Sequence, residues 1–320
     1  SQVVGLGLSQ TNANFIVSGH QDNGTVLKTG STWTNINGGD GGECFTDYTD
    51  NTVIYVQYVE GKYSRSDDGG ANVNPIQTGL PTGMDFYSPF KIDPNNHLKI
   101  YSGGTPVLYT SNNKGDLWSP LGSSAGTNNI KDFVVAPSNS AIIYTVQEDA
   151  ISKSTDSGAS FTNITTGLPT DASFKSITVS NTNPNKIWVT YSGFITTSKV
   201  FKSTDGGSTW TNISSGLPNL AINTVVYRND STQDEVYIGA DIGVFTTSNT
   251  TSSWSSFMTG LPNVAVRDLE IYYPTNKLRA GTYGRGIWES DLSNVGSSTS
   301  WTGAVNTAWD NAGNWSNGVP

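Results

Sequence analysis

The chain has 320 residues and a formal net charge of −9. Charged residues make up only 13% of it, whereas Gly (35), Tyr (14) and Trp (9) are plentiful, a mixture that favours short strands and tight turns over helices. The negative charge argues against a nucleic-acid partner, which needs a basic face, and against an anionic membrane surface. No apolar run is long enough to cross a bilayer, so no membrane insertion is expected.

The chain starts at Ser1 and shows no signal peptide. We interpret it as a mature or trimmed piece of a longer, multidomain exported protein, secreted or at the cell surface. The single cysteine, Cys44, excludes an internal disulfide. Because the chain has only two histidines to activate a thiol, we predict that Cys44 is a small buried residue on a strand.

One motif repeats along the chain. Residues 154–161 and 203–210 both read Ser-x-Asp-x-Gly-x-x-aromatic, and residues 111–118 have Asn in place of Asp. Residues 66–73 keep all but the aromatic residue, residues 247–254 are a decayed copy, and residues 30–33 keep only the end. The five longer copies start 43–49 residues apart, a period that fits one four-stranded propeller blade.

Each copy of the motif is predicted to be a hairpin. The Asp or Asn side chain accepts backbone N–H bonds across the turn, the Gly adopts a left-handed conformation, and the aromatic residue packs between sheets. We therefore assign a structural role to these motif residues: Ser66, Asp68, Gly70, Ser111, Asn113, Gly115, Trp118, Ser154, Asp156, Gly158, Phe161, Ser203, Asp205, Gly207, Trp210 and Trp254.

The repeats predict an all-β chain, a seven-bladed β-propeller of four-stranded antiparallel blades over residues 1–293. Blades begin near Val3, Glu43, Met84, Asn128, Ser173, Leu220 and Val264. In the fourth repeat the strands are expected near residues 130–136, 141–147, 150–154 and 161–164. The last repeat shows only three clear strands, and its fourth could be residues 300–303 or come from upstream of Ser1. Residues 294–320 are then a linker and the start of a following module, or they contain the closing strand of blade 7.

The repeated motif resembles the Asp-box, or BNR repeat, of sialidases, sortilin-type receptors and xyloglucanase-type glycosidases, and the resemblance covers nearly the whole chain. It implies the propeller fold and leaves the function open. Residues 21–24 with 38–43, and residues 283–288, also resemble segments of exported Bacteroidetes proteins. Sialidases hold a carboxylate with three arginines, and only Arg285 falls in a loop at the channel mouth here. Xyloglucanase-type enzymes use a cleft between two propellers, and one propeller is predicted here.

A ligand site is expected at the mouth of the central channel, in the loops between the second and third strands and between blades. Two carboxylates across a cleft there could hydrolyse a glycosidic bond, with about 5–5.5 Å between them in retaining enzymes and 6.5–9.5 Å in inverting ones. Asp22 and Asp241 could equally cap turns by local hydrogen bonds. The catalytic candidates are Asp22, Asp40, Glu43 and Asp241. The ligand-binding candidates are Gln21, Asp22, Asn23, Asp40, Glu43, Asp241, Tyr283 and Arg285.

No cofactor is predicted. Asp-rich loops suit hard cations such as Ca²⁺, although no run matches an established Ca²⁺ loop. His20 and His97 are expected on opposite faces, which argues against a zinc site.

Three functions follow from these features. The first is a non-catalytic binding or scaffolding propeller, with a polysaccharide, a surface glycan or a protein as its partner. The second is a glycoside hydrolase with a carboxylate pair at the mouth. The third is a peptide-binding propeller of the sortilin type.

Overall fold

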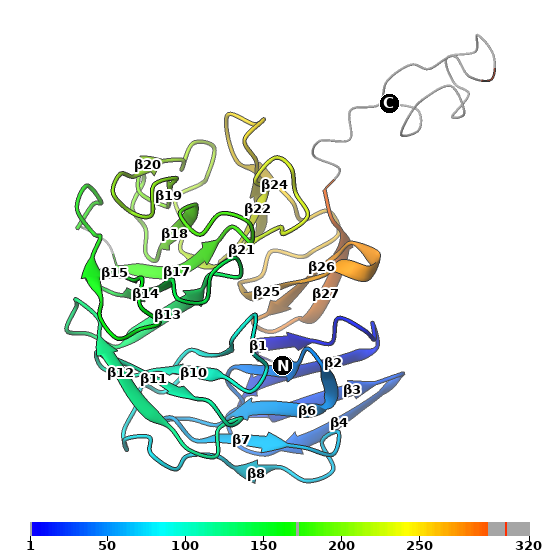
Figure 1. The fold of residues 1–320 in the computed structure, drawn as a ribbon. Helices are drawn as coiled ribbons and strands as arrows, with labels where there is room; N and C mark the ends of the chain where they lie inside the picture. The colour runs from blue at the N-terminus through cyan, green and yellow to red at the C-terminus, as the bar shows by residue number, and fades with distance from the viewer. Residues whose placement is uncertain (1, 171–172, 294–304, 306–320) are drawn as a thin grey trace.

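Seven antiparallel β-sheets make up the described part of the chain and stand around a common axis (Figure 1). The computed structural model describes residues 2–170, 173–293 and 305. We number the sheets blade 1 to blade 7 in chain order. Blades 1 to 6 have four strands each, and blade 7 has three among the described residues. The predicted all-β, seven-bladed propeller is thereby confirmed.

The strands of each blade follow one another in the sequence. Blades 1 to 3 consist of β1 (Gln2–Leu8), β2 (Phe15–Gln21), β3 (Gly24–Thr29), β4 (Thr32–Asn37), β5 (Cys44–Asp47), β6 (Asp50–Gln57), β7 (Tyr63–Ser66), β8 (Asn74–Pro75), β9 (Phe90–Ile92), β10 (Ile100–Gly103), β11 (Val107–Ser111) and β12 (Ser119–Ser123). Blades 4 and 5 consist of β13 (Ile130–Val135), β14 (Ile143–Gln147), β15 (Ile151–Ser154), β16 (Thr162–Asn163), β17 (Phe174–Val179), β18 (Ile187–Tyr191), β19 (Val200–Ser203) and β20 (Thr211–Asn212). Blades 6 and 7 consist of β21 (Ile222–Tyr227), β22 (Val236–Ala240), β23 (Gly243–Thr247), β24 (Ser255–Ser256), β25 (Val266–Tyr272), a short 3₁₀ helix η1 (Tyr273–Thr275), β26 (Lys277–Thr282) and β27 (Gly286–Asp291).

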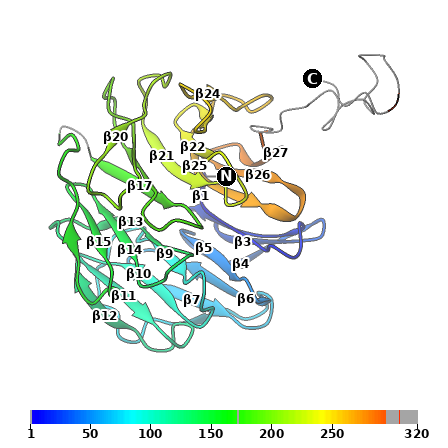
Figure 2. The same cartoon turned by 45° about the horizontal axis from the view of Figure 1, so that its top comes forward.

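The first strand of every blade lies at the axis, and the later strands lie successively further out. Neighbouring first strands contact one another around most of the ring, including β25 with β1 where the ring meets itself (Figure 2). The second strands are buried on both faces, which explains their continuous apolar runs, such as Ile187–Tyr191 in β18. The hydrophobic core is therefore a set of clusters between adjacent blades.

Blade 3 begins later than the sequence predicted. Its first strand, β9, starts at Phe90 and not near Met84. Gly79 and Gly83 have positive φ, and Pro81 and Pro89 lack a backbone N–H, so the chain before Phe90 is held in turns. Met84 is instead buried against Gly61 of blade 2.

The Ser-x-Asp-x-Gly hairpins share one bonding pattern. In blade 5 the Ser203 hydroxyl donates to Asp205 at 2.8 Å and accepts the Gly207 N–H at 2.8 Å, with φ of Gly207 at 92°. Asp205 also accepts the Thr209 hydroxyl and N–H at 2.6 and 2.9 Å. The hydrogen bond from the Thr209 side chain is the main cause that lowers the pKa of Asp205 to about 2.

Replacing Ser203 by alanine is expected to lower the free energy of unfolding by about 1–2 kcal/mol, because the buried Gly207 N–H loses its acceptor. Urea unfolding of the variant measures this change. Replacing the exposed Ser208 of the same hairpin is the control and should have little effect, since its hydroxyl bonds only the nearby Asp205 carbonyl. Equal effects at the two positions would contradict the role given to Ser203.

The tryptophan at the end of three hairpins ties its blade to the preceding one. The indole N–H groups of Trp118, Trp210 and Trp254 donate to backbone carbonyls of the preceding blade, at Ile76 (2.7 Å), Ile164 (3.0 Å) and Ile213 (2.6 Å) respectively. Each accepting isoleucine directly follows the fourth strand of its blade. A fourth strand therefore serves as the docking edge for the next blade.

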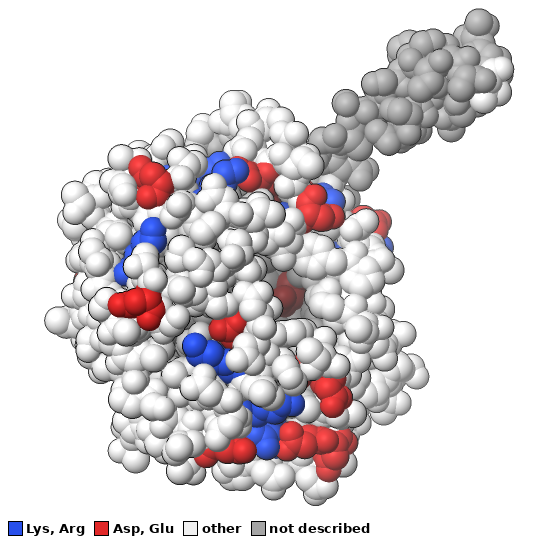
Figure 3. Space-filling view, in the orientation of Figure 1, with Lys and Arg blue, Asp and Glu red and all other residues white. Residues whose placement is uncertain are grey.

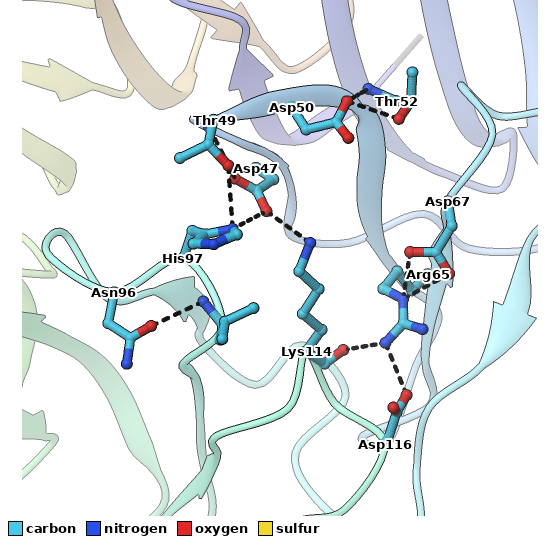
Figure 4. A network of polar contacts seen from close by, with 11 residues as sticks. Asp47, Thr49, Asp50, Thr52, Arg65, Asp67, Asn96, His97, Lys114 and Asp116 are labelled. Atoms are coloured by element: carbon cyan, nitrogen blue, oxygen red, sulfur yellow. Dashed lines mark hydrogen bonds and ion pairs between the residues drawn. The ribbon is translucent and has the colours of Figure 1, made fainter.

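A buried carboxylate links blades 2 and 3 at the turn between β5 and β6 (Figure 4). Asp47 is fully buried and accepts hydrogen bonds from Thr49, while His97 Nδ1 lies 2.8 Å and Lys114 Nζ 3.2 Å from it. His97 and Lys114 both belong to blade 3. His97 thus takes part in an inter-blade contact.

Candidate binding site in the central channel

A cavity of about 610 Å³ lies on the axis of the propeller. Figure 3 shows one face of the molecule, which is hollowed near its middle with an acidic side chain inside the hollow. The charged and amide side chains that line the cavity are Gln21, Glu43, Lys91, Lys131, Asp132, Lys175, Asn223, Arg267, Asp268 and Glu270, with Tyr87 and Tyr283 among the aromatic ones.

An irregularity in five of the first strands places side chains in this cavity. In β1, β13, β21 and β25 one residue near the strand start is skipped in the pairing with the second strand. The skipped residues are Val4, Lys131, Asn223 and Arg267, and a similar shift in β17 includes Lys175. A β-bulge bends the strand and redirects the side chain. All five residues line the cavity.

Two carboxylates directly after bulges bind the neighbouring blade. Asp132 accepts the Ser176 hydroxyl at 2.7 Å and the Ile177 N–H at 3.0 Å, both from blade 5. Lys91 of blade 3 lies 2.5 Å from its other oxygen. Asp268 accepts the Leu6 N–H of blade 1 at 2.8 Å. Burial raises the pKa of Asp268 to about 6, although this backbone bond opposes the shift. Both groups hold the ring of blades together.

Glu43 and Glu270 also face the cavity, but nothing binds their carboxylates. Among the residues that the structure describes, neither side chain has a hydrogen bond or ion pair. Burial, followed by repulsion from Asp268, raises the pKa of Glu43 to about 8. The same causes in the same order raise the pKa of Glu270 well above its usual value. Burial and repulsion therefore favour the protonated form of Glu43.

Of the basic side chains in the lining, Lys91, Lys131 and Lys175 come from blades 3 to 5, and Arg267 comes from blade 7. Burial lowers the pKa of Lys175, which has no ion pair within the described part of the chain. Lys131 pairs with Asp85 at 2.9 Å and Glu148 at 3.2 Å. Acidic and basic side chains thus both line the cavity, with Glu43, Asp268 and Glu270 at blades 2 and 7, next to Arg267, and Asp132 at blade 4 among the lysines.

Several predicted mouth residues bind one another. The Asp22 N–H donates to Asp40 Oδ1 at 2.8 Å, with Asp22 in the left-handed region at φ 61°. Asn23 Nδ2 donates to the Gln21 carbonyl at 3.0 Å. The Tyr283 hydroxyl donates to Gln21 Oε1 at 3.1 Å, which joins blades 7 and 1. Gln21 and Tyr283 line the cavity, whereas Asp22, Asn23 and Asp40 stabilise the adjacent turn.

Asp241 belongs to a polar chain across blades 6 and 7. It accepts Asn223 Nδ2 at 3.0 Å, and Asn223 Oδ1 accepts Arg267 Nη1 at 2.9 Å. The Arg267 guanidinium lies 5.2 Å from the centre of the Tyr283 ring. Asp241 therefore orients a cavity-lining amide rather than capping its own turn. The side chain of Arg285 is exposed and does not line the cavity.

Two glycines within residues 38–43 allow the backbone there to lie close to neighbouring backbone and side-chain atoms. A Cβ on Gly42 would lie 2.3 Å from Gln57 Oε1 and 2.7 Å from the Tyr87 ring, and one on Gly41 would lie 2.3 Å from the Gly24 carbonyl. These contacts account for two of the glycines without a ligand.

The sequence interpretation missed most of the cavity lining, because it searched the loops and not the first strands. The missed residues are Lys91, Lys131, Asp132, Lys175, Asn223, Asp268 and Glu270, and Arg267 was expected away from the mouth. The sequence does contain a pattern that marks these positions, because blades 4 to 7 begin with the same kind of four-residue segment. In each, two apolar residues flank a Lys, Asn or Arg followed by an Asp, Ser or Thr. The segments are residues 130–133, 174–177, 222–225 and 266–269.

No metal site is evident in the described ranges 2–170 and 173–293, where no three His, Cys, Asp or Glu side chains lie close enough to share an ion. His20 is buried and bonds Ser18 at 2.8 Å. The free thiol of Cys44 is buried and lies 3.6 Å from the Gly5 carbonyl.

Comparison with solved structures finds the same fold in proteins of different function. An ancestral GH74 enzyme is 14% identical with a TM-score of 0.75, and the match covers 92% of this chain and 45% of that one. YCF48 bound to D1 peptide is 12% identical with a TM-score of 0.68, and 92% of each chain is covered. The extracellular domain of BT4673 from B. thetaiotaomicron is 15% identical with a TM-score of 0.67, covering 91% of this chain and 38% of that one.

These identities establish the fold and nothing finer. The chain spans about half the length of the GH74 enzymes that it matches. No protein-family model and no curated protein matches the sequence. Over the described residues, the structure has no helix of the length and apolar character required to span a membrane.

Proposed function

We propose that this chain is a non-catalytic binding propeller, which takes a ligand into the central cavity through the channel mouth. The observation that carries the proposal is the pair of unpartnered carboxylates, Glu43 and Glu270, on one side of an open cavity of about 610 Å³. Desolvation and then repulsion from Asp268 disfavour their charged forms, and a bound cation would relieve both effects.

The ligand is accordingly polar and carries a positively charged group, as in a basic peptide or an amino sugar. Lys175, on the opposite side of the cavity, would complement an anionic group on the same ligand. Tyr87 and Tyr283 offer aromatic surface for a sugar ring or an apolar side chain. YCF48, a propeller of similar size, was solved with the D1 peptide bound, which is consistent with a peptide ligand for this fold.

A combined panel of peptides and oligosaccharides, including lysine-containing peptides and glucosamine oligomers, tests this proposal on the full chain. Glu43→Gln should weaken binding of the best ligand by about tenfold or more, the loss of one charge-assisted bond. Asp67→Asn is the matched control, since Asp67 is exposed and pairs with Arg65 in an outer hairpin. An unchanged affinity in Glu43→Gln, or no binding to any cationic ligand, would contradict the proposal.

A glycoside hydrolase is the second candidate, and one observation favours it. Glu43, with its pKa raised to about 8, can hold a proton at neutral pH, as a general acid must, and Asp268 lies near enough to repel it. The other candidates Asp40 and Asp241 are engaged by Asp22 and Asn223. Release of reducing sugar that Glu43→Gln abolishes would establish this function in place of the first.

We further propose that residues 1–293 are a propeller domain of a longer protein that is secreted or at the cell surface, and that the Ser-x-Asp-x-Gly hairpins are Asp-boxes. Their shared hydrogen bonds in blades 2, 4 and 5 support the second point. The extracellular location stated for the BT4673 domain is consistent with the first. Residues 294–304 and 306–320, interpreted as a linker and the start of a following module or as containing the closing strand of blade 7, lie outside the described residues.

A further inference from the structure

Four consecutive blades, 4 to 7, place a hydrogen-bond donor at the same point of their first strands. In each of them the second residue of the opening four-residue segment lies at the bulge in the pairing with the second strand. These residues are Lys131, Lys175, Asn223 and Arg267, and all four line the cavity. Because the four first strands contact one another in order around the axis, these positions form a continuous arc, which we call the donor arc.

Two basic members of the donor arc have no acidic partner. Within the described residues Lys175 has no hydrogen bond or ion pair, and Arg267 makes one hydrogen bond, from Nη1 to the neutral amide of Asn223 at 2.9 Å. Arg267 is exposed, so its remaining N–H groups are open to a ligand. Lys131 differs, because two carboxylates outside the arc already pair with it.

Asp132 attracts Lys175 more than any other carboxylate does, but it does not pair with it. One Asp132 oxygen lies 2.5 Å from Lys91 Nζ, and the other accepts the Ser176 hydroxyl and the Ile177 N–H at 2.7 and 3.0 Å. Both oxygens are therefore engaged in contacts between blades. The charge of Lys175 is left without a counter-ion among the described residues.

The basic side chains of the donor arc also repel one another. Burial is the main cause that lowers the pKa of Lys175. Repulsion from Lys131 and Arg267 lowers this pKa further, against the attraction of Asp132 and Glu43. An anion bound among these side chains would favour the charged form of Lys175 and would offset the repulsion.

We propose that Lys175, Asn223 and Arg267 bind an oxyanion, a carboxylate or a sulfate group, in the central cavity. All three side chains offer N–H donors and two of them are basic, and such donors bind oxyanions by charge-assisted hydrogen bonds. Asp241 accepts one Nδ2 hydrogen of Asn223 at 3.0 Å, which leaves the second hydrogen for the ligand. If the proposed function holds, a single ligand that fills this site and reaches Glu43 carries both an oxyanion and an amino group.

Equilibrium dialysis of radiolabelled sulfate and of radiolabelled acetate against the full chain at low ionic strength tests this site. About one equivalent of at least one anion should bind, and Lys175→Met and Arg267→Gln should each weaken its affinity at least about tenfold. The formal net charge of −9 disfavours non-specific binding of an anion, so a retained anion reports a local site. Binding of neither anion, or an unchanged affinity in Lys175→Met, would overturn the proposal. Acetate and sulfate separate a carboxylate site from a sulfate site.

Lys28→Met is the matched control. Lys28 in β3 also has no ion pair within the described residues, but it lies outside the cavity and donates to Asn14 and to the Gly30 carbonyl. Its replacement should leave the anion affinity unchanged. An equal loss in Lys28→Met and Lys175→Met would mean that the affinity follows the total charge, and would overturn the proposal. The dialysis contains no cationic ligand, so its result does not depend on whether Glu43 binds one.

NMR of the chain with isotopically methylated lysines gives an independent measurement that does not require a cavity variant to bind. An anion that prefers the charged form of Lys175 about tenfold should raise the pKa of this lysine by about 1 at saturation. The Lys175 signal is assigned by its absence in Lys175→Arg, and the Lys28 signal should titrate as before. An unchanged pKa of Lys175 at a saturating anion concentration would place the anion elsewhere and overturn the proposal.

Discussion

Replacing Glu43 by glutamine is expected to raise the free energy of unfolding at pH 8 by roughly 2–3 kcal/mol. The pKa of Glu43 is raised to about 8 in the folded protein, mainly by burial and then by repulsion from Asp268. The contribution of protonated Glu43 to the free energy of unfolding is fully present below the unfolded pKa, near 4.5. This contribution is lost as the pH rises toward the folded pKa of about 8. A shift of this size corresponds to more than 4 kcal/mol, and we reduce it because the cavity is open to water.

Urea unfolding at pH 5 and pH 8 measures this effect. The variant and the unmodified chain should have nearly equal stability at pH 5 and should diverge as the pH rises. Glu60→Gln is the control, because Glu60 is an exposed side chain beside Lys62 and lies outside the cavity. A variant that is less stable than the unmodified chain at pH 8 would mean that the charged form of Glu43 stabilises the fold.

The stability of the chain and its proposed binding function are connected through Glu43. A group that binds a ligand from inside a cavity must remain unpartnered in the empty protein, and this lack of partners destabilises the fold. Glu43→Gln should therefore stabilise the chain and weaken its binding together. If glutamine stabilised the chain with no change in affinity, Glu43 would be a destabilising feature without a role in binding.

Replacing Asp47 by alanine is expected to lower the free energy of unfolding by about 3 kcal/mol. Asp47 is fully buried, and its loss leaves Lys114, His97 and the Thr49 N–H without their shared acceptor (Figure 4). We take the lower end of the range for buried pairs because His97 and Lys114 still reach solvent. Thermal and urea unfolding at pH 7 would measure the change.

The effect of Asp47 should also depend on pH. Burial raises the pKa of Asp47, but its hydrogen bonds with His97, Thr49 and Lys114 outweigh burial and lower the pKa overall. Its contribution to stability is therefore present above the unfolded pKa, near 4, and is lost as the pH falls through the lower folded value. The difference between Asp47→Ala and the unmodified chain should shrink below about pH 4.

Asp50→Ala is the matched control for Asp47→Ala. Asp50 lies three residues away in the same hairpin, is exposed, and bonds only Thr52. Its replacement should change stability little. If both alanine variants lost the same stability, the hairpin itself and not the inter-blade contact would account for the loss.

The repeats predicted the fold because the residues that form the hairpin of each blade are close together in the sequence. Ser154, Asp156 and Gly158 bond within five residues of one another, so their spacing in the sequence predicts a hairpin without knowledge of the rest of the chain. Successive hairpins about 45 residues apart then imply stacked sheets around an axis. The confirmed seven-bladed fold rests on these local signals.

The cavity could not be predicted in the same way, because its residues come from strands far apart in the sequence. Lys91 lies beside Asp132, and Asp268 binds the Leu6 N–H across 262 residues. The pKa of Glu43 is raised by burial and then by Asp268, which is on the far side of the ring closure. Of the candidates taken from loops, Glu43, Gln21 and Tyr283 line the cavity.

The sequence by itself thus determined the elements with local hydrogen bonds and a regular period, namely the hairpins, the strands and the number of blades. Only the tertiary structure decided which charges meet at the axis and which tryptophans are buried between blades. Trp33 illustrates the difference, since its motif is identical to that of Trp210, yet Trp33 is 48% exposed whereas the Trp210 indole N–H donates to Ile164 of the preceding blade. Long-range contacts are set by how the blades close into a ring, and no single repeat encodes that closure.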